Sequence, residues 1–248
     1  MKSIIQKVAN LCEIILLPGG WDLKLKHRRF NWRDYRMCLR LRASGVTPAS
    51  IFDVGANEGQ FAIGARATFP DAALYCYEPG QSAFSRLQAA LGGRDRIVLA
   101  NRALGAEAGR SFLRVTTADQ SSSLLPLHEN HLRAYPGVRE AAREEVDVST
   151  LENELSRLNP TGPALLKIDT QGFEMQVLAG AGAAVSRFRW IVLEASTRPM
   201  YQGEVLFDEM TAWLNGRGFA FRGPIELNFT PSGEACQFDA LYESASPE

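Results

Sequence analysis

The pattern of the chain changes at residues 50–59, which read Ser-Ile-Phe-Asp-Val-Gly-Ala-Asn-Glu-Gly. The run 50–54 is short and mostly apolar, which predicts a buried strand. Gly55 and Gly59 predict a tight turn, because glycine adopts positive φ and lets a ligand approach the backbone closely. A helix is predicted to follow over residues 58–69. This strand–turn–helix unit is typical of an α/β fold with a ligand at the turn.

The alternation of short apolar strands and helices continues along the chain. Further strands are predicted at 74–77, 97–99, 111–115, 145–148, 164–169, 190–194, 219–222 and 236–242, and further helices at 82–91, 150–158, 173–184 and 207–215. Such alternation predicts a Rossmann-like α/β sheet that is mainly parallel and covered by helices on both faces. No helix separates the last two strands, so we expect them to form an antiparallel pair at the sheet edge.

Length and composition predict one α/β domain over residues 46–248, preceded by a helical extension over residues 1–45. Residues near 116–140 read as a long polar loop insertion. Loops longer than about 12–15 residues are usually functional or disordered, so we expect this one to cover a site. The 27 basic and 28 acidic residues nearly balance, which predicts no nucleic-acid partner. The four scattered cysteines are typical of reduced thiols in a cytoplasmic protein.

The first 16 residues carry apolar side chains at helical spacing, interrupted by Lys7, Asn10 and Glu13. This pattern predicts an amphipathic helix rather than a secretory signal. No segment reaches the roughly 18 apolar residues of a membrane span. A basic stretch follows at residues 24–29. It is either a solvated connector or a weak contact for a membrane surface or another polyanion.

Polar residues collect where the predicted strands end, at Asp53, Glu78, Asn101, Asp169 and Glu194. In open α/β sheets, ligands bind outside the carboxyl ends of the strands. The sequence therefore predicts that these five side chains surround one site.

The turn after the first strand is not the dinucleotide fingerprint, because Asn57 stands where the second glycine is needed. A smaller turn suits a nucleotide-like ligand without a pyrophosphate, although a structural turn with no ligand remains an alternative. Glu78 follows about 20 residues later, where an acid accepts hydrogen bonds from ribose hydroxyls. Asp53 is placed to accept from a cationic amine. We expect a side chain at Gly55 to fill ligand space and leave the protein folded.

Asp169 and Glu194 end neighbouring strands. They are candidates for a divalent-cation site, or one of them for a general base. Glu194 has a second interpretation, in which it caps a helix or pairs with Lys167 or an arginine. His128 is a further candidate base, with an exposed loop histidine as the alternative. Ser122 and Ser123 either reach a ligand carboxylate or cap a turn.

The order of these segments resembles the FkbM family of S-adenosylmethionine-dependent methyltransferases. The segments that carry the resemblance are Ile51–Gln60, Tyr77–Pro79, Asn101–Gly105, Ser121–Leu124, Val146–Leu151, Leu166–Glu174 and Val177–Ala181. The resemblance implies a class I methyltransferase sheet, S-adenosylmethionine as methyl donor, and methylation of a hydroxyl, often on a sugar or polyketide.

The resemblance also implies roles for individual residues. Donor-binding positions carry over onto Asp53, Gly55, Ala56, Asn57, Gly59, Glu78, Pro79 and Asn101. Ser122, Ser123 and Asp169 fall where the donor's methyl end and the acceptor should meet. Magnesium-dependent methyltransferases of this fold place acids at the ends of the same two strands, which makes Mg²⁺ at Asp169 and Glu194 a hypothesis.

Two alternatives stay open for the function. One is an oxidoreductase linked to NAD or a nucleotide sugar on a similar sheet, and the other is a ligand-binding module without catalysis. The preferred reading is an O-methyltransferase acting on a small-molecule or carbohydrate acceptor. The sequence allows an oligomer but does not specify one.

Overall fold

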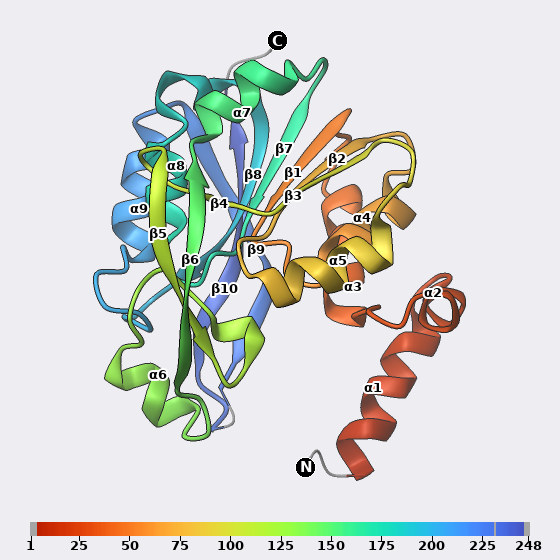
Figure 1. The fold of residues 1–248 in the computed structure, drawn as a ribbon. Helices are drawn as coiled ribbons and strands as arrows, with labels where there is room; N and C mark the ends of the chain where they lie inside the picture. The colour runs from red at the N-terminus through yellow and green to blue at the C-terminus, as the bar shows by residue number, and fades with distance from the viewer. Residues whose placement is uncertain (1–3, 231, 246–248) are drawn as a thin grey trace.

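A seven-stranded sheet runs through the centre of the protein (Figure 1). The computed structural model describes residues 4–230 and 232–245. The strand order is β3-β2-β1-β7-β8-β10-β9. The bounds are β1 Ser50–Val54, β2 Ala73–Tyr77, β3 Ile97–Ala100, β7 Ala164–Ile168, β8 Phe188–Ser196, β9 Phe219–Phe229 and β10 Ala235–Ser244. The first five strands in this order are parallel, and β10 is antiparallel to both of its neighbours. The predicted mainly parallel sheet with an antiparallel edge is confirmed.

Helices cover both faces of this sheet (Figure 1). One face carries α3 (Trp32–Ala43), α4 (Gln60–Thr68) and α5 (Gln81–Leu91) over one apolar core. The other carries α7 (Leu151–Leu158), α8 (Glu174–Ala179) and α9 (Phe207–Asn215) over a second core. All residues of β1 and β7 are buried, because these strands lie in the middle of the sheet between the two helical layers.

A second sheet of three strands lies beside the first and contains β4 (Ala103–Leu104), β5 (Gly109–Thr116) and β6 (Glu140–Ser149). The two strands predicted at 111–115 and 145–148 belong here, paired antiparallel with each other. Most of their residues are exposed or half-buried. This alternating exposure suits an antiparallel pair with one face in solvent, not a parallel strand covered on both sides.

The segment after β5 holds a 3₁₀ turn at Asp119–Ser121 and the short helix α6 (Glu129–Ala134) before β6 begins at Glu140. The helix predicted at 173–184 is shorter than expected. It ends at Ala179, and a 3₁₀ turn follows at Gly182–Arg187. Gly180 and Gly182 fall at this break, where glycine favours the end of a helix.

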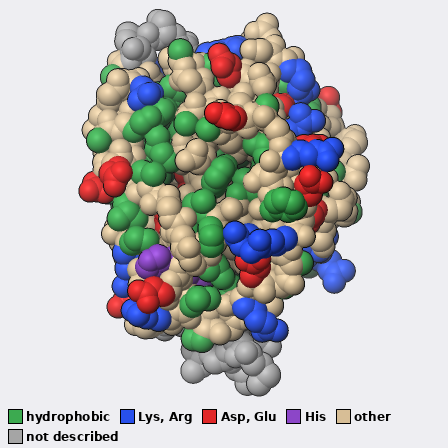
Figure 2. Space-filling view, turned by 60° about the vertical axis from the view of Figure 1, so that its left-hand side comes forward, with side chains coloured by type: hydrophobic (Ala, Val, Ile, Leu, Met, Phe, Trp, Pro, Cys, Tyr) green, Lys and Arg blue, Asp and Glu red, His purple; other side chains and the backbone are tan. Residues whose placement is uncertain are grey.

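The N-terminal part forms three helices, α1 (Ile4–Leu16), α2 (Gly20–Lys26) and α3, and its first three residues lie outside the described part. Figure 1 shows α1 and α2 at the edge of the molecule, whereas α3 packs directly on α4. Among the described residues, no helix combines the length and apolar character needed to cross a membrane. Basic and acidic side chains are interspersed on the face seen in Figure 2.

Candidate functional site

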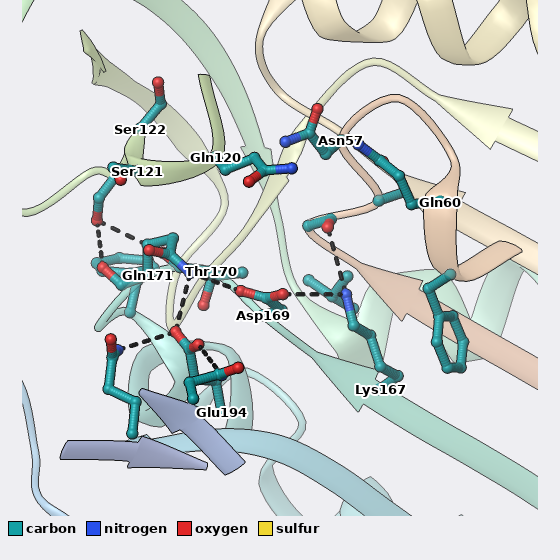
Figure 3. A pocket seen from close by; sticks show the side chains of 18 of the residues that line it. Asn57, Gln60, Gln120, Ser121, Ser122, Lys167, Asp169, Thr170, Gln171 and Glu194 are labelled. Carbon is teal, nitrogen blue, oxygen red and sulfur yellow. Dashed lines mark hydrogen bonds and ion pairs between the residues drawn. The ribbon is translucent and has the colours of Figure 1, made fainter. Parts of the chain in front are cut away.

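A cavity of about 460 Å³ lies at the carboxyl ends of the central strands. Its walls come from the turn after β1, from Glu78 and Pro79 after β2, from residues 120–124, and from residues 169–171 after β7 (Figure 3). Three of the five predicted strand-end residues, Glu78, Asp169 and Glu194, line this cavity, whereas Asp53 and Asn101 do not. Residues of α3, β9 and β10, which were not predicted at the site, complete the lining of the cavity.

The turn after β1 is fixed between the ends of β2 and β7. The backbone N–H groups of Gly55 and Ala56 both donate to the Tyr77 carbonyl at 3.0 Å. Gly55 has φ +80°, and a Cβ there would lie 1.9 Å from the Asp169 carbonyl oxygen. The expectation that a Gly55 side chain would only fill ligand space is therefore wrong, because it would first collide with the backbone of the neighbouring strand end.

Gly59 does not line the cavity. Its φ is +90°, and a Cβ would lie 2.8 Å from Leu87 Cδ1, so this glycine lets α4 start close against α5. Asn57 and Ala56 do line the cavity. The Oδ1 of Asn57 is buried and has no hydrogen-bond partner within the described residues, which leaves an acceptor for a ligand.

Glu78 is a buried carboxylate held by backbone donors on both sides. Its Oε2 accepts from the Asn57 N–H and its Oε1 from the Gly80 N–H, each at 2.8 Å. Burial raises the pKa of Glu78 to about 7, and the two N–H donors oppose that shift. The side chain is thus oriented before any ligand arrives, with its remaining lone pairs available to hydroxyl donors.

Asn101 supports Glu78 from behind and does not line the cavity. Its Nδ2 donates to the backbone carbonyls of Glu78 and Pro79, each at 2.9 Å. The residue predicted to touch a ligand is placed as a positioning residue for the strand end, while Pro79 itself reaches the cavity.

Asp53 and Lys167 form a buried ion pair across β1 and β7. They are register partners, and Lys167 Nζ lies 3.2 Å from Asp53 Oδ1 and 3.6 Å from Asp169 Oδ2. Burial disfavours the ammonium, but Asp53 and Asp169 outweigh it and raise the pKa of Lys167. Asp53 does not line the cavity. Asp53 accepts from the amine of Lys167 rather than from a ligand. Lys167 is the one charged residue of the otherwise apolar strand β7, and this feature of the sequence could have indicated the ion pair.

The side-chain amide of Gln171 joins Asp169 to Glu194 (Figure 3). Its Nε2 lies 2.8 Å from Asp169 Oδ1 and 2.8 Å from Glu194 Oε2. Glu194 also accepts from Asn228 Nδ2 at 3.1 Å and Gln237 Nε2 at 3.0 Å. Glu194 is buried, and burial with the nearby Asp169 and Asp239 raises its pKa. The hydrogen-bond partners of Glu194 are amides. The alternative interpretation, in which Glu194 pairs with Lys167 or caps a helix, is therefore not what the structure shows.

This arrangement does not fit a resident divalent cation. An amide N–H₂ group, which is a donor, binds both carboxylates that a cation would need as ligands. Within the described ranges, no group of three or more His, Cys, Asp or Glu side chains has a geometry that could hold a metal ion. The carboxylates of Asp169 and Glu194 therefore accept hydrogen bonds from an amide instead of binding a cation.

Four acids from four adjacent strands line one side of the cavity, and we call them the acid row: Asp169, Glu194, Asp239 and Glu226. Asp169 directly follows the last residue of β7, which is paired with Leu193 of β8, so it adjoins Glu194. Asp239 of β10 is the register partner of both Glu194 and Glu226. Side chains at paired positions point to the same face of a sheet. The prediction missed Asp239 and Glu226, because the register of the last hairpin sets their places.

The helix α3 brings residues 31–37 to the cavity from outside the predicted domain. Asp34 and Arg33 line it, and burial raises the pKa of Asp34 to about 7 while Lys167 opposes the shift. Arg36 anchors the helix through two bonds to Glu226 of 2.7 and 2.8 Å. The N-terminal extension is therefore a wall of the site, and no motif in residues 31–37 signalled this.

The segment after β5 supplies a further wall. Ser122 and Ser123 line the cavity, but their hydroxyls bond to the protein: Ser122 Oγ accepts from the Thr116 N–H at 3.1 Å, and Ser123 Oγ donates to the Gln171 carbonyl at 2.7 Å. His128 does not line the cavity and caps α6, where its Nδ1 accepts from the Asn130 N–H. This placement does not support a catalytic role for His128. The histidine in the cavity wall is His131.

Comparison with known proteins bears on this fold and this site. A candidate O-methyltransferase from Klebsiella pneumoniae has a similar structure, with a TM-score of 0.56, 15% identity, and 97% of each chain covered. The 2-O-methyltransferase NoeI of Sinorhizobium fredii is 29% identical over 161 residues, which are 62% of this chain. The match spans 66% of NoeI, just under two thirds of its length.

Residues 53–221 match the methyltransferase FkbM domain. This range contains every strand-end acid that the sequence predicted, whereas Asp34, Glu226 and Asp239 lie outside it. The match covers well over half of the chain, and the protein therefore belongs to the FkbM family of methyltransferases.

Proposed function

We propose that this chain transfers the methyl group of S-adenosylmethionine to a hydroxyl group of a small-molecule or carbohydrate-like acceptor. The observation that carries the proposal is the oriented, buried carboxylate of Glu78 facing the same cavity as Asp169. An acid at the end of the second strand of such a sheet accepts from ribose hydroxyls. Family membership supports a methyl donor as the nucleoside-containing ligand.

The charge of the cavity favours a cationic donor. Six acids line it, Asp34, Glu78, Asp169, Glu194, Glu226 and Asp239, against Arg33 and Lys167. Burial raises the pKa of Asp34, Glu78 and Glu194, and a cation bound beside them would favour their charged form. When bound, the donor supplies an electrophilic methyl group on a positively charged sulfur. Glu78 and the Asn57 Oδ1 are the groups of this chain that would hold its nucleoside.

The acid row and its amide neighbours favour a hydroxyl-bearing acceptor. Carboxylates accept hydrogen bonds from hydroxyls, and the side chains of Asn228 and Gln237 can both donate and accept. All of these side chains line the same cavity. The name of the relative NoeI specifies a 2-O-methyltransferase, which supports oxygen as the atom that is methylated.

Asp169 is the residue of this chain best placed to take the proton of the acceptor. Its side chain is 36% exposed, whereas the oxygens of Glu194 already accept from three amides. With the donor and acceptor bound, Asp169 would accept the hydroxyl proton while the donor would supply the methyl group to the acceptor oxygen. Lys167 Nζ, 3.6 Å from Asp169 Oδ2, stabilises the carboxylate before transfer. Gln171, in place of a divalent cation, keeps Asp169 aligned.

The proposal is tested by calorimetric titration with S-adenosylmethionine, its demethylated product and NAD, followed by turnover assays on a panel of hydroxyl compounds. We expect binding of the first two and no binding of NAD. Glu78→Gln should weaken donor binding about tenfold or more, since hydrogen bonds to charged groups contribute roughly 1.5–3 kcal/mol. Binding of NAD alone would overturn the proposal. Donor binding without transfer to any acceptor would favour a non-catalytic ligand-binding module.

A further inference from the structure

The first two helices expose an unusual number of apolar side chains. Twelve large hydrophobic side chains of the described residues are exposed, and six of them lie within residues 8–25. These six are Val8, Leu11, Ile15, Leu16, Trp21 and Leu25, with exposed fractions between 43% and 79%. Single exposed apolar residues are normal, but a cluster of this size marks a surface that contacts something other than water.

The exposed apolar residues of α1 form one continuous face. Val8, Leu11, Cys12 and Ile15 are exposed and recur at the spacing that places residues on one side of a helix. Ile14 on the opposite side is buried in the core under α3. The exposed face carries no charged side chain among the described residues. Glu13, the acid of this helix, lies off that face and pairs with Arg36.

Cations accompany the exposed apolar residues Trp21 and Leu25 of α2. Lys24, Lys26 and Arg28 are exposed, and none of them has an ion pair with a carboxylate within the described part of the chain. Arg94, also exposed, lies close enough that it and Lys26 lower the pKa of His27, in addition to the effect of burial. The acid of α2 is Asp22. The exposed charged residues between positions 22 and 28 are therefore net positive.

We propose that α1 and α2 form a docking surface for an anionic phospholipid bilayer. Helices that lie in the plane of a membrane bury an apolar face among the lipid headgroups, while lysine and arginine beside that face meet anionic headgroups. A second copy of the chain fits less well, because the same surface on that copy offers Asp22 as the acid of α2 against the cations Lys24 and Lys26. The surface is independent of the methyl-transfer proposal, since none of its residues lines the cavity.

The docking surface directly precedes one wall of the cavity in the chain. The connector after α2 leads directly to Asn31, Arg33 and Asp34, which line the cavity. Figure 1 shows α1 and α2 projecting from the side of the molecule on which α3 lies.

The test is co-sedimentation of the whole protein with phosphatidylcholine vesicles that contain or lack phosphatidylglycerol. We expect the protein to bind the anionic vesicles at least about tenfold more tightly than the neutral ones, and to be released by added salt. Trp21 emission should shift to the blue on binding, and this shift should be lost in Trp21→Phe. Failure to bind anionic vesicles would overturn the proposal, whatever the protein does with a methyl donor.

Matched variants distinguish binding through this surface from non-specific adsorption to vesicles through any exposed apolar side chain. Ile15→Glu removes an apolar side chain that is 61% exposed on α1, and Phe112→Glu removes one that is 58% exposed on β5. Ile15→Glu should weaken vesicle binding about tenfold while Phe112→Glu leaves it unchanged, with equal thermal stability in both. Lys24→Gln combined with Lys26→Gln should abolish the preference for anionic lipid. Equal binding by both glutamate variants, or a dimer that Ile15→Glu dissociates without any vesicle binding, would refute the bilayer as the partner.

Discussion

The hydroxyl of Tyr201 donates a hydrogen bond of 2.7 Å to the Oε1 of Gln171. One orientation of the Gln171 amide satisfies this bond and the bonds to both carboxylates. Carboxylates only accept, so the Nε2 must face Asp169 and Glu194, and the Oε1 is left for a donor. Tyr201 is buried and supplies that donor. The alignment of Asp169 thus depends on a hydroxyl that does not itself line the cavity.

Tyr201→Phe should therefore slow methyl transfer without weakening donor binding. Loss of the bond to Gln171 corresponds to roughly 0.5–1.5 kcal/mol, or about three- to tenfold in kcat. The variant also loses the 3.2 Å contact of this hydroxyl with the Ser121 carbonyl. Tyr242→Phe is the matched control, because its buried hydroxyl makes a 2.7 Å bond to Thr211 away from the cavity. An equal loss of kcat in both variants would show that the effect comes from stability alone.

Asp169→Asn should lower kcat by about 10²–10⁴-fold, which is the range for a removed general base. The donor Kd, measured by calorimetry, should change by less than about threefold, since Glu78 and Asn57 are intact. Asp147→Asn, at a side chain that is 74% exposed, serves as the control. Turnover that survives in Asp169→Asn would assign a structural role to this carboxylate.

Two glycine variants separate backbone strain from collision. Gly45 and Gly55 both have positive φ, but a Cβ on Gly45 meets no atom within 4 Å, whereas one on Gly55 meets the Asp169 carbonyl at 1.9 Å. Gly45→Ala should lower the free energy of unfolding by about 1–2 kcal/mol through strain. Gly55→Ala should lower it by at least about 3 kcal/mol. Chemical denaturation checks both, and equal losses would contradict the close contact between the two strand ends.

Glu174→Gln should change how stability depends on pH. Oε1 of Glu174 accepts all three of its hydrogen bonds, from the Thr170 N–H and hydroxyl and the Gly172 N–H, and glutamine retains this oxygen. Burial raises the pKa of Glu174 to about 7, above its value of 4.5 in the unfolded chain. The folded state therefore binds more protons between these values, and stability falls as pH rises through this window.

The glutamine variant has no such titration. The difference in free energy of unfolding, variant minus wild type, should increase by up to about 3 kcal/mol from pH 4.5 to pH 8. Thermal unfolding at both pH values measures the difference, in which the similar shifts of Glu78 and Asp34 cancel. A difference that stays constant with pH would show that Glu174 does not titrate in this range.

Asp34→Asn should affect the acceptor and spare the donor. Asp34 enters the cavity from α3, on the side of Lys167, Asp169 and Glu226. We expect KM for the acceptor to rise about threefold to tenfold, as for one lost hydrogen bond, with the donor Kd unchanged. Asp22→Asn, on the exposed surface of α2, is the control. A changed donor Kd would show that Asp34 contacts the donor rather than the acceptor.

The features that the sequence predicted are those that neighbouring residues determine. Apolar runs identified the central strands. Glu78 and Asp169 directly follow theirs, and Glu194 ends the apolar run of β8, so these three acids were found. His128 and His131 lie on one short helix, and only the packing of α6 decides which of them faces the cavity. Asp34 and Glu226 are 192 positions apart, and the Arg36 ion pair that joins their elements has no local signature.

The pairing of β10 with its two neighbours has a consequence for how the enzyme matures. Side chains alternate between faces along a strand, so a slip of one residue would turn Asp239 into the opposite layer. Two members of the acid row, Asp239 and Glu226, come from this C-terminal hairpin, beyond the stretch that defines the family. A nascent chain that has completed its donor-binding half still lacks half of this wall. The wall that we propose for the acceptor is therefore complete only when β9 and β10 are paired in this register.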